Sequence, residues 1–363
     1  MEKILFINPF GLGDVLFTTP LVRAVKNKYP DSFLGFICNQ ESACVLENNP
    51  FVDKVFFFTR GDFKKIKKKS FFKYLSNLLQ AMLTIKKYRF DLCFDLSLVN
   101  QYNVVLWLLG VKQRWGINYK NRGFLLSSKI NISGFKDKHV LIYYKELLQQ
   151  QGVNNIEDKP EIFLTKKEKD KAQEFLKENN FVVNKAERIK QKLVGVVPFG
   201  GGSWGSDAKN KQWPIERFIS VIKRINQDFN ARIILFGSGL ERQKAQELVT
   251  QAAEVKIINA VGKTSLRELF GLIECCDLVL ANDSGPLHAA TALGIKTVSI
   301  YGPVNEKVYG PLGEKENNIV LSKQLDCRPC YRNFTKTGCD IMQCLLSITE
   351  EEVLTSLERL IKG

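Results

Sequence analysis

The segment from Asp277 to Pro303 carries residue types suited to holding a phosphate. Its apolar run Leu278–Ala281 predicts a buried strand, which stops at the polar turn Asn282-Asp283-Ser284-Gly285. A helix of small residues is expected to begin at about Pro286, and its N-terminus would present N–H groups and the positive end of a dipole. An acid, a hydroxyl and a glycine at such a turn predict a site for a nucleotide diphosphate.

A second phosphate candidate is the glycine-rich run Gly200-Gly201-Gly202-Ser203, which follows the apolar segment Leu193–Val197. Glycines allow a ligand to approach the backbone closely. Lys211 lies just ahead of Pro214, a residue typical of a first helical position, so its ammonium could add charge to that helix N-terminus. An ordinary flexible loop is the alternative, but a glycine run directly after a buried strand favours ligand contact.

Asp14 is the candidate general base. The predicted strand Lys3–Asn8 leads into Gly11-Leu12-Gly13-Asp14, and a helix is expected from Val15. Leu16 occupies the position of the third glycine in a dinucleotide fingerprint, which argues against a dehydrogenase. Asp14 stands where an N-cap residue belongs, so one interpretation is purely structural. The other is a carboxylate kept anionic by the helix dipole and able to accept a proton; both roles can coexist.

Glu241 is a candidate for contact with a ribose. It follows the predicted strand Arg232–Phe236 and a turn containing Gly237 and Gly239. Its carboxylate could accept hydrogen bonds from ribose hydroxyls, or simply occupy a first helical turn, where acids are favoured. No two aspartates are separated by a single residue, so the metal-chelating Asp-x-Asp motif is missing. A diphosphate would then be neutralised by lysine and helix N-termini.

Four of the nine cysteines, Cys327, Cys330, Cys339 and Cys344, lie within eighteen residues. Two short cysteine hairpins can present four thiolates to zinc or iron. Free thiols or a disulfide pair are the alternatives. Any metal here would be structural and remote from the phosphate-binding residues. Nine cysteines without an export signal indicate a reducing, cytoplasmic environment.

The formal net charge is +15, and its distribution is uneven. From Lys54 to Arg89 there are eleven Lys and Arg residues against one acid, Asp62, with aromatic residues between them. A nucleic-acid site is not expected, because no RNA- or DNA-binding motif accompanies the run. A solvated lysine face is one interpretation; contact with an anionic membrane surface or an anionic, lipid-linked acceptor is the preferred one. The longest apolar stretch, Val104–Gly110, is too short to span a membrane.

Apolar runs alternate with helical periods, which predicts an α/β protein with parallel sheets covered on both faces. A polar segment, Asn154–Pro160, divides the chain into two doubly wound domains, 1–160 and 161–363, expected to face each other across a cleft. The expected strands are Lys3–Asn8, Phe33–Cys38, Lys54–Phe58, Leu92–Leu96, Leu193–Val197, Arg232–Phe236, Asp277–Ala281 and Thr297–Ile300. The expected helices are Val15–Lys28, Phe71–Lys87, His139–Gln151, Lys166–Asn179, Pro214–Phe229, Leu240–Ala253, Ser265–Cys275 and Thr349–Leu360.

Together these motifs resemble the ADP-heptose:lipopolysaccharide heptosyltransferases, glycosyltransferase family 9. The resemblance covers most of the chain and rests on Gly11–Ala24, on Lys211-Gln-Trp213-Pro214, and on Asn282–His288 through Tyr301-Gly-Pro303. It implies a two-domain, Rossmann-like GT-B fold and an inverting, metal-independent transfer. The sugar would be heptose or a related sugar from ADP-heptose, and the acceptor a lipopolysaccharide core or another lipid-linked glycan.

The resemblance also implies residue roles. Asp14 matches the base that the family is proposed to use, Lys211 matches the lysine on the donor diphosphate, and Glu241 falls near the acid that binds the ribose. Some members carry a Cys-x-Pro-Cys segment, as at Cys327-Arg-Pro-Cys330. The expected acceptor-side residues are Gly11 and Gly13; the expected donor-binding residues are Gly201, Gly202, Ser203, Lys211, Glu241, Asp283, Ser284, Gly285, Pro286 and His288.

The resemblance implies no catalytic cofactor. The enzyme is expected in the cytoplasm or bound peripherally to the inner face of the cytoplasmic membrane. Two alternatives remain at this stage. A GT-B-like sugar-nucleotide epimerase would act on the donor without an acceptor, and a non-catalytic nucleotide- or glycan-binding peripheral membrane protein would show no turnover.

Overall fold

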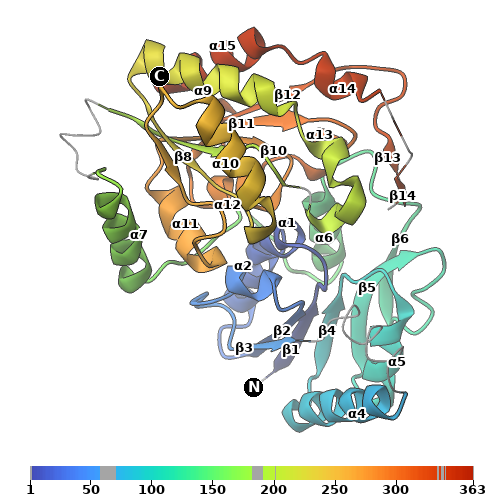
Figure 1. Cartoon of the computed structure of the whole chain (residues 1–363). Helices are drawn as coiled ribbons and strands as arrows, with labels where there is room; N and C mark the ends of the chain where they lie inside the picture. Colours follow the sequence, from blue (N-terminus) through green and yellow to red (C-terminus); the bar gives the residue numbers. More distant parts are fainter. Residues whose placement is uncertain are drawn as a thin grey trace. The chain divides into compact units, whose positions relative to one another are not determined.

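The computed structural model describes residues 2–57, 71–181, 191–200, 202–332, 335–336, 339 and 341–362. The chain divides into two compact units, Met1–Phe163 and Leu164–Gly363. Each unit contains one six-stranded sheet in which neighbouring strands run parallel (Figure 1). The predicted α/β class, with two doubly wound sheets, is confirmed.

The sheet of the first unit has the order β3-β2-β1-β4-β5-β6. The winding reverses between β1 and β4, which pair with each other, and this reversal defines the point where α/β sheets bind ligands. Residues Ile4–Ile7 of β1 are fully buried, as expected of a parallel strand covered on both faces. The strands are β1 Lys3–Ile7, β2 Phe33–Cys38, β3 Lys54–Phe57, β4 Leu92–Asp95, β5 Gln113–Tyr119 and β6 Ser128–Ile132. The helices are α1 Leu12–Leu16, α2 Thr19–Lys28, η1 Ser42–Val45, α4 Phe71–Tyr88, α5 Asn100–Leu108 and α6 Val140–Gln149.

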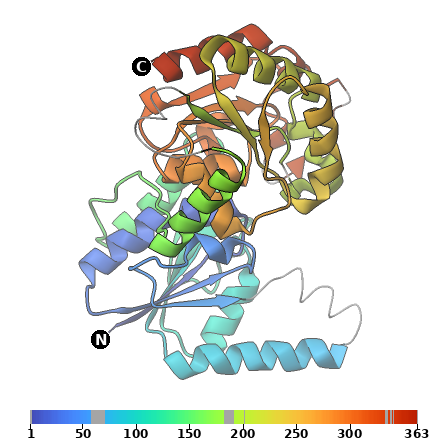
Figure 2. The ribbon, with the colours of Figure 1, turned by 60° about the vertical axis from the view of Figure 1, so that its left-hand side comes forward.

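One face of this sheet is covered by α4 and α5 (Figures 1 and 2). Ile85 of α4 and Leu106 of α5 belong to one buried cluster with Leu5 and Ile7 of β1 and Phe56 of β3. The outer side of α4 is different in character, because its Leu79 and Leu83 side chains are largely exposed.

The second unit repeats the topology, with the order β12-β11-β10-β7-β8-β9 and the reversal between β7 and β10. Its core includes the buried stripe Phe218, Ile222 and Ile225 of α9. The strands are β7 Leu193–Val197, β8 Arg232–Leu235, β9 Ile257–Asn259, β10 Leu278–Asn282, β11 Lys296–Tyr301, β12 Asn318–Ser322, and the hairpin β13 Tyr331–Arg332 and β14 Thr335–Lys336. The helices are α7 Lys166–Glu178, η2 Gly202–Lys211, α9 Ile215–Phe229, η3 Gly239–Glu241, α10 Arg242–Gln251, α11 Leu266–Glu274, α12 Gly285–Ala292, α13 Glu306–Tyr309, η4 Lys315–Asn317, α14 Gln343–Leu346 and α15 Glu350–Lys362.

Several elements differ from the sequence-based expectation. The strands β5, β6, β9 and β12 and the helix α5 were not predicted. Three of these strands, β6, β9 and β12, are sheet edges whose apolar runs are no longer than three residues. The strand β5 begins with two polar residues, Gln113 and Arg114. The helix expected over Val15–Lys28 is two helices that break at Phe17 and Thr18, because Pro20 has no backbone N–H to donate to a preceding turn. Phe58 lies outside the described residues.

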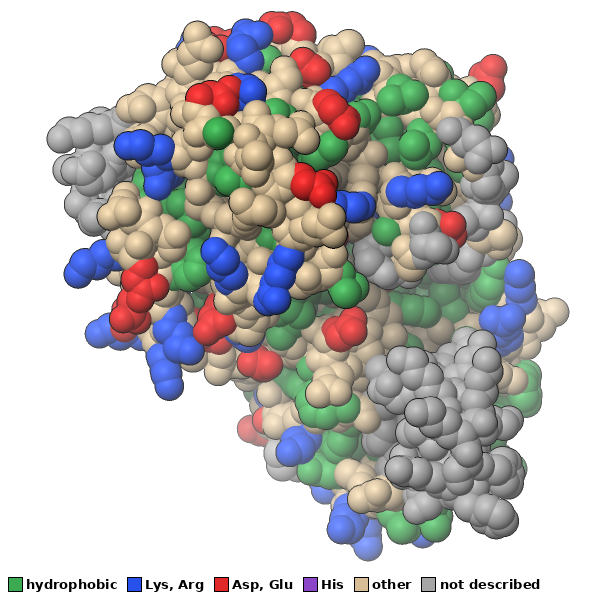
Figure 3. Space-filling view, viewed as in Figure 1, with side chains coloured by type: hydrophobic (Ala, Val, Ile, Leu, Met, Phe, Trp, Pro, Cys, Tyr) green, Lys and Arg blue, Asp and Glu red, His purple; other side chains and the backbone are tan. Residues whose placement is uncertain are grey.

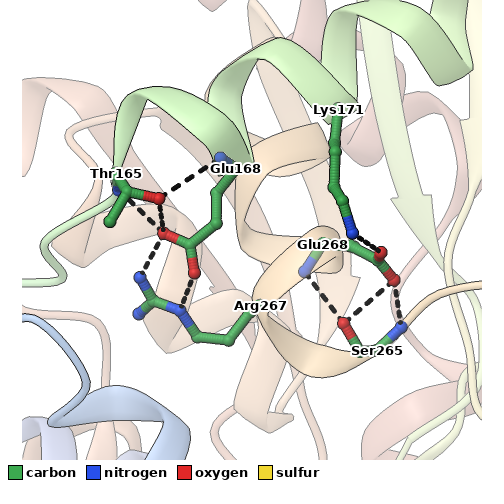
Figure 4. Close-up of polar contacts among 6 residues, drawn as sticks. All are labelled: Thr165, Glu168, Lys171, Ser265, Arg267 and Glu268. Carbon is green, nitrogen blue, oxygen red and sulfur yellow. Dashed lines mark hydrogen bonds and ion pairs between the residues drawn. The ribbon is translucent and has the colours of Figure 1, made fainter.

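Within the second unit, α7 is fastened to α11 by side chains at the start of each helix (Figure 4). Thr165 and Glu168 form a capping box at α7, and Ser265 and Glu268 form another at α11. Arg267 bridges the helices, donating from Nε and Nη2 to the two carboxylate oxygens of Glu168 at 2.6 and 2.8 Å. These hydrogen bonds lower the pKa of Glu168 to about 2.

In the parts of the chain that the structure describes, no helix combines the length and the apolar character needed to cross a membrane.

Candidate functional site

The candidate donor residues of the second unit cluster where the winding of the sheet reverses. The strands β7 and β10 are neighbours and run parallel, so their carboxyl ends meet at one edge. The loop after β7 leads through η2 to Lys211, and β10 ends directly before Asp283. Such an edge is the usual ligand position of a doubly wound sheet.

Lys211 and Asp283 form a buried ion pair at this edge. The Lys211 Nζ lies 2.5 Å from Oδ2 of Asp283, and the side chains are only 10% and 7% exposed. The same ammonium lies 5.0 Å from the ring centroid of Trp204, within the range of a cation–π contact. A buried charge requires a partner, and the carboxylate of Asp283 supplies one and holds the ammonium in place. The structure thus brings together two residues that lie 72 positions apart in the sequence.

The turn after Asp283 begins a helix, as expected, although one residue earlier. The helix α12 starts at Gly285, with Ser284 as its N-cap and Pro286 in its first turn. Ser284 is buried, and among the described residues its Oγ has no hydrogen-bond partner. Buried hydroxyls are normally bonded, and a ligand anion at this N-terminus would satisfy this one. His288 is also buried, with Nε2 3.9 Å from Oδ1 of Asp283.

Asn282 contributes to the site although sequence reasoning assigned it no role. It is fully buried, and its Oδ1 accepts the backbone N–H of Trp213 at 3.0 Å. Its Nδ2 donates to the carbonyl of Pro198 at 2.9 Å. One amide thus joins the end of β10 to the loop after β7 and to the segment before α9. A buried polar residue at the end of an apolar strand is the signal that identifies it.

Gly200 and Glu241 bind each other beside this cluster. Gly200 has φ +114°, and a Cβ there would lie 2.9 Å from the Cβ of Ser284, so only glycine fits. Its N–H donates to Oε1 of Glu241 at 3.2 Å, while Oε2 accepts from the N–H and Oγ of Ser238 at 2.6 and 2.9 Å. Glu241 thus lies in the first turn of η3, as the structural alternative expected, and the ribose interpretation stays a prediction. Gly201 lies outside the described residues; the backbones of Gly202 and Ser203 belong to η2.

In the first unit, Asp14 follows β1 at the reversal of that sheet. The expectation that Asp14 is the N-cap is wrong: Gly11 is the N-cap of α1, and Asp14 lies in the first turn together with Gly13. The helix starts earlier because Gly11 is extended and Leu12 is already helical. The Asp14 Oδ2 accepts the N–H of Gly11 at 3.1 Å. This half-buried carboxylate therefore satisfies a helix N–H from inside the helix, and its role as a base stays a prediction.

Three of the four cysteines of the C-terminal segment, Cys330, Cys339 and Cys344, line one pocket. All nine cysteines lie in the described residues, and none forms a disulfide. Burial raises the pKa of Cys330, and the thiols of Cys327 and Cys339 raise it further. Among the side chains that the structure describes, no group of three or more His, Cys, Asp or Glu residues is placed to hold a metal ion. A structural metal at these cysteines stays a prediction. The pocket is lined by Trp204, Asn210, Pro303, Cys330, Tyr331, Cys339, Met342 and Cys344.

Comparison with known proteins agrees with this arrangement. The family model described as glycosyltransferase family 9 (heptosyltransferase) matches residues 79–339. A lipooligosaccharide heptosyltransferase 2 of Campylobacter jejuni is 26% identical over 368 residues, with 99% of each chain covered. A glycosyl transferase family 9 structure from Veillonella parvula superposes with a TM-score of 0.79 at 24% identity, covering 99% of this chain and 97% of that one. The ADP-heptose LPS heptosyltransferase II of E. coli superposes with a TM-score of 0.73 at 20% identity, covering 99% of both.

The two doubly wound units and the likeness to these solved structures show that the fold is of the GT-B class of glycosyltransferases. Because the family model matches well over half of the chain, the protein belongs to glycosyltransferase family 9, the heptosyltransferase family. It is an enzyme that transfers a sugar.

Proposed function

We propose that this enzyme transfers heptose from ADP-heptose to a lipopolysaccharide core or another lipid-linked glycan, with inversion and without a metal ion. Family membership supports the class of sugar, and the name of one structural neighbour specifies ADP-heptose. The observation that carries the proposal is the buried Lys211–Asp283 pair at the N-terminus of α12. Lys211 supplies a cation and the N-terminus of α12 supplies backbone N–H groups, and the two together neutralise a diphosphate.

This arrangement supports the donor half of the proposed reaction. The diphosphate would lie against the N-terminus of α12, where the Ser284 hydroxyl and the backbone N–H groups donate to its oxygens. Lys211 would turn its ammonium from Asp283 toward the phosphate. As the bond between the anomeric carbon and the diphosphate oxygen breaks, negative charge develops on the departing ADP. Fixed positive charge in a dry site stabilises this charge most effectively.

The acceptor half would depend on Asp14. Its carboxylate accepts the proton of the acceptor hydroxyl while the hydroxyl oxygen forms the new bond to the anomeric carbon, opposite to the departing diphosphate. The configuration at that carbon is therefore inverted. The products are the extended glycan, ADP and a protonated Asp14, which returns its proton to solvent. Because the acceptor is lipid-linked, we place the enzyme in the cytoplasm, at the surface of the membrane.

The test is sugar transfer by Asp14→Asn, with Asp31→Asn, an exposed aspartate of the same unit, as the matched control. Wild type and Asp31→Asn should glycosylate the lipid-linked acceptor, whereas Asp14→Asn should lose transfer by at least about a hundredfold. The Asp14→Asn variant should still bind ADP. Undiminished transfer by Asp14→Asn would remove the base assignment.

The nucleotide is tested by thermal shift with ADP, UDP, GDP and CMP. At about 100 times Kd, the preferred nucleotide should add roughly 2.7 kcal/mol of stability. A preference for UDP or GDP would contradict ADP-heptose as the donor. Conversion of the sugar nucleotide in the absence of acceptor would instead indicate an epimerase.

A further inference from the structure

The outward side of α4 and α5 carries large apolar side chains in positions where a solvated helix usually carries polar ones. Leu79 and Leu83 of α4 are 56% and 50% exposed, and Trp107 and Leu108 of α5 are 54% and 60% exposed. Single exposed apolar residues are ordinary, but a group of them marks a contact surface. We call these four residues and the cations around them the α4–α5 surface.

Helix geometry shows that the two leucines of α4 lie in the middle of its outward side. Ile85 packs into the core on the opposite side of the helix. Leu79, Leu83 and Lys87 follow one another at intervals of four residues, so they form one stripe on an α-helix. All three are exposed. The stripe is thus apolar along its length and ends in a lysine.

The neighbouring helix α5 continues this apolar surface. Both helices contribute to the same buried cluster on one face of the sheet, and Figures 1 and 2 both show them side by side. The sequence of α5, Asn100–Leu108, contains no charged residue. Its last turn presents Trp107 and Leu108 outward, and tryptophan is the residue most typical of a membrane–water interface.

The charged side chains of α4 are all basic, and the exposed acid that follows the helix, Asp91, accepts the backbone N–H of Lys3 at 2.9 Å. Lys86, Lys87, Arg89 and Lys112 are exposed, and within the described residues none of them is in an ion pair. The sequences of α4 and α5 contain no Asp or Glu. Figure 3 shows this mixture of hydrophobic and basic side chains at the α4 end of the first unit. The complementary partner is therefore anionic and has an apolar interior.

We propose that the α4–α5 surface binds the anionic surface of a lipid bilayer, with the leucine and tryptophan side chains entering the headgroup region. This inference rests on the proposed function, because a lipid-linked acceptor is presented at a bilayer. Lysines attract the negatively charged headgroups, and apolar side chains of an interfacial helix supply the remaining affinity. A second copy of the chain is disfavoured as the occupant, since two surfaces of the same positive charge repel each other.

Binding is measured by sedimentation of the full chain with vesicles of phosphatidylcholine, alone or mixed with phosphatidylglycerol. Wild type should bind the mixed vesicles, and high salt should weaken this binding. The double variant Leu83→Glu/Trp107→Glu should partition at least about tenfold less. The matched control is Ile341→Glu in the second unit, where an isoleucine that is 70% exposed also becomes an acid.

A charge-reversal pair tests the electrostatic part separately. Lys86→Glu/Lys87→Glu should lower partitioning by about tenfold or more, because two attractive charges become repulsive. Lys166→Glu/Lys167→Glu makes the same change at two exposed lysines of α7 and should leave binding close to wild type. Thermal unfolding of each variant checks that it is folded; the lysine variants alter only exposed side chains and provide the test should the apolar variant fail to fold.

The outcomes separate this inference from the proposed function. Equal binding by wild type and both α4–α5 variants overturns the inference, as does equal loss in the two controls, whatever the enzyme transfers. Vesicle binding that depends on the α4–α5 surface, in a protein that transfers no heptose, upholds the inference and removes the proposed function. If both hold, the variants should transfer sugar normally to a delipidated acceptor and poorly to the same acceptor in vesicles.

Discussion

The side-chain oxygen of Asn282 accepts the backbone N–H of Trp213 at 3.0 Å, joining the end of β10 to the residue two positions after Lys211. The amide nitrogen of Asn282 donates to the carbonyl of Pro198 at the end of β7. One buried side chain thus fixes the loop that carries Lys211 against the strand that leads to Asp283. The ion pair of these two residues depends on that support.

Replacing Asn282 by Ala should therefore weaken both folding and donor binding. The substitution leaves a buried N–H and a buried carbonyl without partners, at about 1–3 kcal/mol each. Urea unfolding measures the stability, and calorimetric titration measures the affinity for ADP. The control is Asn226→Ala on α9, which removes a side-chain hydrogen bond to the carbonyl of Ala231. Asn226→Ala should lower stability but leave the affinity for ADP unchanged. Equal ADP affinity in the two variants would show that Asn282 does not support the donor site.

Lys211→Met should lower kcat/KM by about a hundredfold to a thousandfold, the usual effect of losing one stabilising group for a developing anion. It should also destabilise the fold by about 3 kcal/mol, because Asp283 stays buried without its partner. Lys209→Met, a change at an exposed lysine two residues earlier, is the control and should behave like wild type. Adding Asp283→Asn to Lys211→Met should recover stability but not activity. Recovery of both would show that the lysine is only structural.

Glu241→Gln distinguishes the two interpretations of that residue. Both carboxylate oxygens accept hydrogen bonds, so the amide group must meet at least one donor, and stability should fall by about 1–2 kcal/mol. The decisive measurement compares ADP with its 2′-deoxy and 3′-deoxy analogues. If Glu241 only supports Gly200, the variant weakens binding of all three ligands by the same factor. If it binds the ribose, the wild type prefers ADP and the variant loses that preference.

The bridge between Glu168 and Arg267 predicts a specific pH dependence. The pKa of Glu168 is about 2 in the folded protein, against an ordinary value of 4.5. The folded state therefore favours the ionised carboxylate, and the stabilisation is fully present above pH 4.5 and is lost as the pH falls toward 2. Urea unfolding over this range should show less acid destabilisation in Arg267→Met than in wild type. Identical pH profiles would mean that the bridge adds nothing to stability.

Much of the fold could be predicted because buried parallel strands appear in the sequence as continuous runs of apolar residues. Leu193–Val197 and Leu278–Ala281 are such runs, and both are central strands. The edge strands β6, β9 and β12 were missed because their apolar runs are short, at most three residues in β12. The start of α1 was misplaced for a different reason, because the position of a helix cap depends on backbone angles that residue type alone does not fix.

The sequence by itself determined the class of the protein, the strand-to-helix turns and the residue types at each turn, because these depend on neighbours along the chain. Only the tertiary structure decided that Lys211 meets Asp283, that Asn282 joins β7 to β10, and that Glu241 already bonds Gly200 and Ser238. It also decided that four apolar residues of α4 and α5 face outward. The physical reason is the same in each case. Strand order and helix packing determine which distant side chains share a buried space or a surface. The local pattern of residues does not predict that order.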